Sequence, residues 1–179
     1  MTKLTLYIFL FLLTQSWSLH SYAKGTYLEP EKFLSDVFNN NPPNPKKLWL
    51  KKELKKEIKK ILGDEFKPLR LRYWDDGSKK AWILERIGRD KPITTGYVTS
   101  KGKILDVKVL VFRESRGWEV RYPFFTEQFS DATLKSDTKL DRKIDGISGA
   151  TLSVDALIKL ARLALFLDKH VDDKKIENK

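Results

Sequence analysis

The 179-residue sequence contains no cysteine and only two histidines. Without cysteine the chain can form no disulfide, no thiolate metal site, no thioether link to haem and no lipid-modified thiol. His20 lies in the N-terminal apolar segment, so His170 is the only imidazole in the remainder. A histidine-rich zinc or copper site within one chain is therefore excluded, and a Ser-His-Asp triad would depend on His170. We predict neither metal ligands nor catalytic residues.

A long hydrophobic run is missing as well. The apolar stretch at residues 4–13 (LTLYIFLFLL) covers ten positions, well short of the roughly 20 that a membrane-spanning helix needs. Lys3 precedes it, and Ser21 and Ala23 place small residues where a signal peptidase cuts. We therefore expect residues 1–23 to be a cleaved signal peptide, with retention as a membrane anchor as the alternative. An exported chain without cystines is typical of the periplasm, so we expect a periplasmic location.

The amino-acid composition of the chain supports a folded domain. Hydrophobic residues make up 41% of the chain, with five tryptophans and ten phenylalanines, which is enough to bury a core. The formal net charge of +11 indicates acidic partners or an anionic membrane surface. Export argues against nucleic acid as the partner.

The pattern over residues 24–66 predicts an N-terminal helical segment. One short helix is expected over 28–40 and a lysine-rich helix over 46–63 (KKLWLKKELKKEIKKILG). The second helix carries one apolar stripe at helical spacing, made of Leu50, Leu54, Ile58 and Ile61. Its lysine face is interpreted either as a solvated surface or as a docking face for anionic lipid or an acidic protein.

Alternating patterns from residue 67 onward predict strands. They are expected at 68–74, 80–88, 93–100 and 104–112. The turn sequences DDGS and KGK join consecutive strands as hairpins, which makes the sheet antiparallel.

The remaining elements complete an α+β domain over residues 67–171. Residues 113–125 are expected to form a loop and residues 125–134 a short helix. Residues 152–170 predict a long C-terminal helix whose broad apolar stripe packs on the sheet, and residues 172–179 a charged tail.

Residues 145–151 read DGISGAT and stand directly before that long helix. Asp145, Ser148 or Thr151 would serve as an ordinary helix cap. A hydrolase nucleophile is not supported, because the G-x-S-x-G pattern fails at Ala150 and no histidine base is at hand. A third interpretation is an anion site, since a glycine-containing turn that enters a helix presents backbone N–H groups and the positive end of the helix dipole.

The same residues resemble the flavinylation motif D-x-x-[ST]-G-A-[ST] of the FMN-binding domain family. That family includes a subunit of the sodium-pumping NADH:quinone reductase and one of the related electron-transport complex. The resemblance extends over residues 95–119 and covers roughly residues 93–171. It implies that a magnesium-dependent flavin transferase esterifies the FMN phosphate to Thr151. Asp145, Ser148, Gly149 and Ala150 would be read by the transferase and would shape the phosphate turn.

The loop after the predicted hairpin departs from the family. Larger members carry H-x-E-T-P-G there, whereas this chain has residues 112–117 as FRESRG, so that only Glu114 and Gly117 match. These two residues are weaker candidates for flavin contact. An aromatic residue that shields the flavin ring would come from Trp118, Tyr122, Phe124 and Phe125, each of which is equally well explained as a core or surface residue.

The resemblance implies a periplasmic flavoprotein that exchanges electrons with a periplasmic or membrane-bound redox partner rather than a stand-alone enzyme. The lysine-rich helix would dock that partner. The alternative is a cofactor-free basic module that binds anionic lipid or an acidic protein.

Overall fold

The computed structural model describes residues 25–135 and 138–177, and side chains up to residue 174. The predicted signal peptide lies outside these residues. Within them, no helix is long and apolar enough to cross a membrane.

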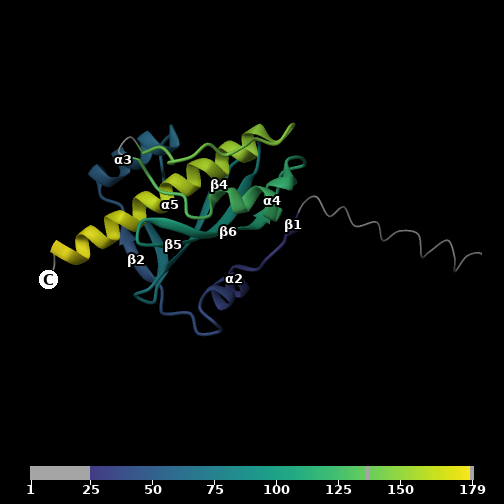
Figure 1. Ribbon diagram of the computed structural model, residues 1–179. Helices are drawn as coiled ribbons and strands as arrows, with labels where there is room; N and C mark the ends of the chain where they lie inside the picture. The colour runs from purple at the N-terminus through teal and green to yellow at the C-terminus, as the bar shows by residue number, and fades with distance from the viewer. Residues whose placement is uncertain (1–24, 136–137, 178–179) are drawn as a thin grey trace, which may run out of the picture.

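The domain is built on one antiparallel sheet of six strands in the order β1-β6-β5-β4-β3-β2 (Figure 1). The strands are β1 (Gly25–Thr26), β2 (Lys46–Trp49), β3 (Arg70–Asp75), β4 (Lys80–Ile87), β5 (Pro92–Ser100) and β6 (Lys103–Phe112). The predicted hairpins join β3 to β4 and β5 to β6, and β4 pairs with β5 along its whole length. The predicted α+β class with an antiparallel sheet is confirmed.

Helices cover both faces of this sheet. The long helix α5 (Thr151–Glu177) crosses one face diagonally with α3 (Lys52–Leu62) beside it, and α2 (Pro30–Val37) lies on the other face (Figure 1). On the α2 face, Phe33 lies directly over Gly96 of β5, where an added Cβ would come within 2.5 Å of its ring. Glycine at position 96 thus allows the helix to approach the strand closely.

Helix α5 is the main element of the larger hydrophobic core. Its buried residues include Leu157, Leu160, Ala161, Leu163, Ala164 and Leu167, packed in one cluster with Trp82 and Tyr97 of the sheet. The Tyr97 hydroxyl donates to the Leu157 carbonyl oxygen at 2.9 Å, which satisfies a buried polar group. The broad apolar stripe of the sequence is therefore buried against the sheet as predicted, except at its first residue, Leu152, which is 51% exposed.

The predicted helix over residues 46–63 is wrong in its first turn. Residues 46–49 form strand β2, in which Leu48 is buried while Lys47 and Trp49 are exposed, and they pair with residues 70–73 of β3. Helix α3 begins only at Lys52 and ends at Leu62, and the next residue, Gly63, has a φ of 85° and closes the helix in the left-handed conformation. An apolar–polar pattern over only four residues cannot distinguish a strand from one helical turn. The pairing with β3 therefore determines that these residues form a strand.

Other boundaries also shift. The helix expected over residues 28–40 spans only Pro30–Val37. Residues 123–129 form a single helical turn, α4 (Pro123–Thr126), and a 3₁₀ turn, η3 (Glu127–Phe129), in place of a helix to residue 134, while the preceding loop contains a 3₁₀ turn, η2 (Trp118–Arg121). Helix α5 starts at Thr151 and continues to Glu177, so most of the expected charged tail is helical.

Candidate functional site

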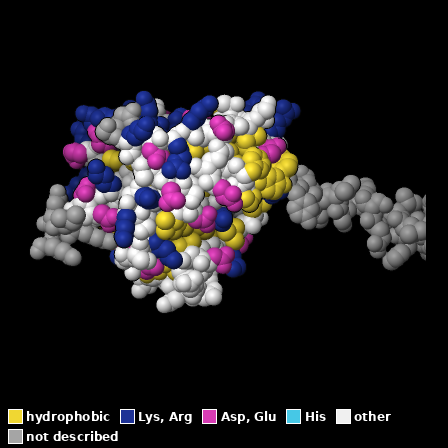
Figure 2. Space-filling model, viewed as in Figure 1, with side chains coloured by type: hydrophobic (Ala, Val, Ile, Leu, Met, Phe, Trp, Pro, Cys, Tyr) yellow, Lys and Arg dark blue, Asp and Glu magenta, His cyan; other side chains and the backbone are white. Residues whose placement is uncertain are grey.

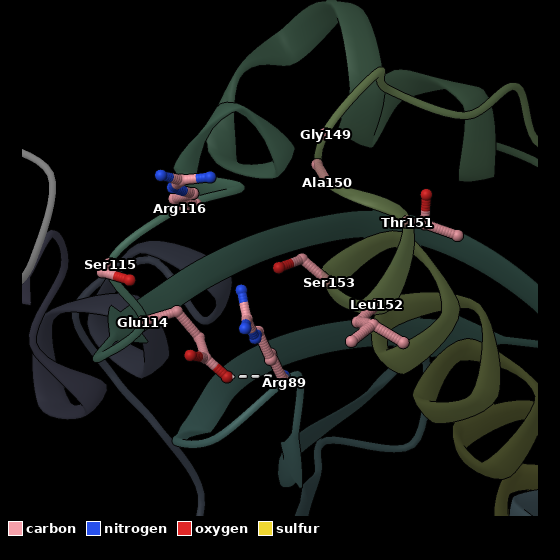
Figure 3. A pocket seen from close by; sticks show the side chains of 9 residues that line it. All are labelled: Arg89, Glu114, Ser115, Arg116, Gly149, Ala150, Thr151, Leu152 and Ser153. Carbon is pink, nitrogen blue, oxygen red and sulfur yellow. Dashed lines mark hydrogen bonds between the residues drawn. The ribbon is translucent and has the colours of Figure 1, made fainter.

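A pocket of about 250 Å³ lies at the N-terminal end of α5 (Figure 3). Three segments far apart in the sequence form it: the turn between β4 and β5, the loop after β6, and the first turn of α5. The lining residues are Arg89, Glu114, Ser115, Arg116, Gly149, Ala150, Thr151, Leu152 and Ser153. The fold thus brings Glu114 together with the last three residues of the DGISGAT motif. These candidate site residues come from separate segments of the sequence.

The backbone of the motif forms a turn that leads into α5. The Ala150 N–H donates to the Ile147 carbonyl oxygen at 3.0 Å, Gly149 has a φ of 80°, and the Val154 N–H begins the helical ladder on the Ala150 carbonyl. The N–H groups of residues 151–153 fall in the first helical turn, where no intrahelical acceptor exists. Among the described hydrogen bonds, no side chain of the motif caps this turn. The first turn is therefore open to an anion, and the simple cap interpretation finds no support.

Asp145 and Ser148 stand apart from the pocket. Both are exposed and neither lines it. The Asp145 backbone N–H donates to the Gln128 side-chain oxygen at 2.7 Å, which fixes the chain before the turn while leaving the carboxylate outward. These two side chains are accessible to another protein that approaches Thr151.

Gly117 holds the loop after β6 against the first turn of α5. It has a φ of 82°, and a Cβ added there would lie 2.6 Å from the Ser153 Oγ and 3.3 Å from the Ala150 Cβ. Ala150 itself is buried. The glycine and the alanine that the family motifs share therefore act together as a close-packing contact that sets the position of Thr151.

Glu114 is a buried carboxylate that organises a turn. Only 3% of its surface is exposed, and its Oε1 accepts the backbone N–H groups of Arg89, Asp90 and Lys91 at 2.6, 2.7 and 2.9 Å. Burial alone would raise the pKa of Glu114, but these three donors outweigh it and leave the pKa below its usual value. Glu114 thus shapes the wall of the pocket by holding the turn that carries Arg89.

Glu114→Gln is expected to lower the free energy of unfolding by about 1–3 kcal/mol at neutral pH, because a neutral amide oxygen is a weaker acceptor for three N–H groups. Since the folded-state pKa of Glu114 is depressed, its contribution is present above pH 4.5 and is lost as the pH falls toward the folded-state pKa. Urea unfolding of both proteins at pH 7 and pH 3 measures this. A stability difference of equal size at the two pH values would contradict the role assigned to the carboxylate.

Two arginines give the pocket its charge. Arg89 extends from the β4–β5 turn toward the Ser153 hydroxyl, and Arg116 lies on the loop after β6, next to Ser115 (Figure 3). Sequence reasoning did not select either residue. Arg116 stands in the FRESRG loop, where it gave a weak signal, but nothing in the sequence links Arg89 to the motif. Together with the helix N-terminus they make the pocket suited to a phosphate.

The aromatic candidates lie outside this pocket. Phe125 is fully buried and packs edge-on against Phe129, with ring centroids 5.6 Å apart, so it has no face open to a flavin. The Arg121 guanidinium lies over the rings of Trp118 and Tyr122 at 5.2 and 4.9 Å.

Apolar surface near the helix start remains open. Phe124 and Leu152 are 61% and 51% exposed. Figure 2 shows an apolar patch over the α4 region.

The described residues contain no group of three or more His, Asp or Glu side chains that would hold a metal ion. A basic pocket at the start of a helix, on an α+β domain, is a site that can accept a phosphate-bearing ligand.

Residues 88–165 match the model of the FMN-binding domain family, so this part of the chain is an FMN-binding domain. The matched segment contains all the residues that line the pocket. FMN is therefore the cofactor, and the cofactor-free alternative is not supported. Comparison with curated proteins and with solved structures gave no match.

Proposed function

We propose that the protein is a periplasmic electron-transfer flavoprotein in which the FMN phosphate is esterified to the Thr151 hydroxyl. The observation that carries the proposal is the position of Thr151 in the first turn of α5. It is exposed at the rim of a pocket that Arg89 and Arg116 make basic. A phosphodiester keeps one negative charge, which the helix N-terminus and the two guanidinium groups stabilise.

The pocket fits the phosphate end of FMN better than the whole cofactor. Its volume of about 250 Å³ is below the roughly 300–1,000 Å³ of sites that enclose an entire ligand of this kind. The isoalloxazine ring is then held outside the pocket, accessible to another protein. A covalent link prevents loss of a cofactor that is bound in so open a site. When bound, FMN supplies the redox chemistry, while the chain supplies placement and charge.

Among the described residues, the buried carboxylate Glu114 and the imidazole of His170 are not placed to activate Thr151. Glu114 is engaged with three backbone N–H groups, and His170 lies 19 residues along α5, roughly 28 Å away. A threonine hydroxyl is a weak nucleophile without a base. The proposal therefore includes a magnesium-dependent flavin transferase, which would recognise the exposed Asp145 and Ser148 beside Thr151.

The test is to co-express the full chain with such a transferase, denature it, and examine it on a gel under ultraviolet light and by intact mass. The expected result is a fluorescent band and a mass increase equal to FMN less one water. Fractionation of the cells is expected to recover the labelled protein with the periplasm. A dark band with only the mass of the polypeptide would refute the covalent link.

A further inference from the structure

One face of α3 presents a cluster of lysines to solvent. The lysine face is defined here as Lys52, Lys55, Lys56, Lys59 and Lys67, which with Phe66 and Glu65 line a hollow of about 480 Å³. In Figure 2, lysine and arginine side chains gather at the upper left, where α3 lies in Figure 1. Glu65 is the only acidic residue in the lining, and it pairs with Lys59 at 3.3 Å. The positive charge of this surface is therefore largely uncompensated.

The orientation of α3 is fixed by its buried side. Leu54, Ile58, Ile61 and Leu62 are buried in the main core. At its C-terminal end, Arg86 of β4 donates to the Leu62 carbonyl oxygen at 3.0 Å and to Asp64 at 2.9 Å. The helix cannot rotate without exposing its apolar side, so the lysine face is held outward.

An exposed apolar side chain flanks the lysine face. Leu69 is 70% exposed. The Leu50 N–H donates to the Leu69 carbonyl oxygen at 3.0 Å, and the Lys55 ammonium donates to the Lys67 carbonyl oxygen at 3.2 Å. These bonds place the segment before β3 against the start of α3, so Leu69 lies beside the lysines. Trp49 belongs to the other face of the sheet, because Leu48 next to it in β2 points into the core under α3 and the Arg70 guanidinium lies over the Trp49 ring at 5.6 Å.

We propose that the lysine face, with Leu69 at its edge, docks the domain on an anionic membrane surface. Lysines beside an exposed leucine are residues that contact headgroups at a bilayer surface. Protein–protein interfaces are instead depleted in lysine and enriched in arginine, which is absent from this face. Flexible lysine side chains suit a fluid surface without fixed register. This surface requires no flavin and goes beyond the proposed function.

The test is flotation of the full chain with vesicles of phosphatidylcholine alone or mixed with phosphatidylglycerol, at low salt. The chain is expected to bind the anionic vesicles more tightly, and the binding to weaken as salt is added. The variant Lys52→Gln/Lys56→Gln/Lys59→Gln removes three charges from one helix face and is expected to weaken anionic-vesicle binding roughly a hundredfold. If the apolar run at residues 4–13 is retained, it contacts both vesicle types alike and cancels in the comparison.

The matched control is Lys32→Gln/Lys108→Gln/Lys143→Gln, which removes three exposed lysines on other elements and lowers the net charge equally. It is expected to keep most of the binding. Equal loss in the two triple variants would overturn the proposal in favour of a general charge effect. Binding of the lysine face to polyglutamate without preference for anionic vesicles would overturn it in favour of an acidic protein.

Discussion

Replacing Thr151 by valine is expected to abolish covalent FMN. Valine has nearly the shape of threonine but no hydroxyl, so no phosphoester can form. The side chain is exposed in the first turn of α5, and valine and threonine have similar helix propensities. The change in the free energy of unfolding is thus expected to stay within about 0.5 kcal/mol. The measurements are in-gel fluorescence and intact mass after co-expression with the transferase.

Two further variants separate the acceptor from its surroundings. Thr151→Ser keeps the hydroxyl and is expected to keep the adduct. Ser153→Ala removes the hydroxyl that points into the pocket and is expected to leave the covalent link in place while weakening contact with the phosphate (Figure 3). Labelled Thr151→Val protein together with unlabelled Ser153→Ala protein would show that the attachment residue was misassigned.

The sequence is informative about elements whose signals are local. The motif, the long helix after it and the two hairpins are each defined by contiguous residues, and all are present in the fold. Strand β2 could not be predicted because residues 46–49 run straight into the lysine-rich helix with the same composition. Its pairing with β3 depends on residues more than 20 positions away.

The pocket was predictable only in part, for the same reason. Thr151 and its neighbours could be found from the motif, but Arg89 and Arg116 reach the site through separate segments. Glu114 could be singled out by the family pattern, whereas its three N–H partners come from a turn 23–25 residues earlier. Convergence of this kind is a property of tertiary structure and leaves no periodic signal.

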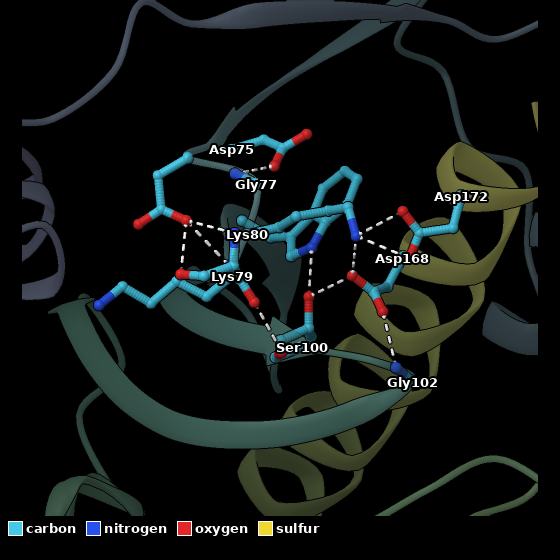
Figure 4. Close-up of polar contacts among 12 residues, drawn as sticks. Asp75, Gly77, Lys79, Lys80, Ser100, Gly102, Asp168 and Asp172 are labelled. Atoms are coloured by element: carbon cyan, nitrogen blue, oxygen red, sulfur yellow. Dashed lines mark hydrogen bonds and ion pairs between the residues drawn. The ribbon is translucent and has the colours of Figure 1, made fainter. Parts of the chain in front are cut away.

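Asp168→Ala is expected to lower the free energy of unfolding by about 3–5 kcal/mol, because it removes a carboxylate from a buried ion pair. Asp168 is fully buried in α5 and pairs with the Lys80 ammonium of β4 at 2.9 Å, while Asp172 pairs with the same ammonium at 2.8 Å (Figure 4). Only 6% of the Lys80 side chain is exposed. Removing one carboxylate therefore leaves a buried ammonium with half of its compensation.

The substitution also removes acceptors from two further donors. The Thr99 hydroxyl donates to Asp168 at 2.7 Å and accepts from the Trp82 indole N–H at 3.0 Å, and the Gly102 N–H donates to the other carboxylate oxygen at 3.1 Å. A single side chain thus ties α5 to β4 and β5 and to the turn before β6. Loss of buried hydrogen bonds to a charged group adds to the cost.

The pH dependence gives a second readout. Burial lowers the pKa of Lys80, but the hydrogen bonds and charges of Asp172 and Asp168 outweigh it, and the pKa is raised above 10.5. Stability from this network is therefore fully present below pH 10.5 and is lost as the pH rises through the folded-state pKa. In Asp168→Ala protein, the free energy of unfolding is therefore expected to fall less as the pH rises through this range than in the unsubstituted protein.

The exposed Asp173→Ala is the matched control, because it removes the same charge from the same helix without a buried partner, and it is expected to change stability by no more than about 0.5 kcal/mol. Urea unfolding at pH 7 measures both variants. Similar stabilities for the two would show that the network does not hold α5 in place. Because residue 168 lies 17 positions from Thr151, roughly 26 Å along the helix, Asp168→Ala protein that remains folded at low temperature is still expected to accept FMN. Stability and cofactor attachment are thus located at opposite parts of one helix, and variants can separate them.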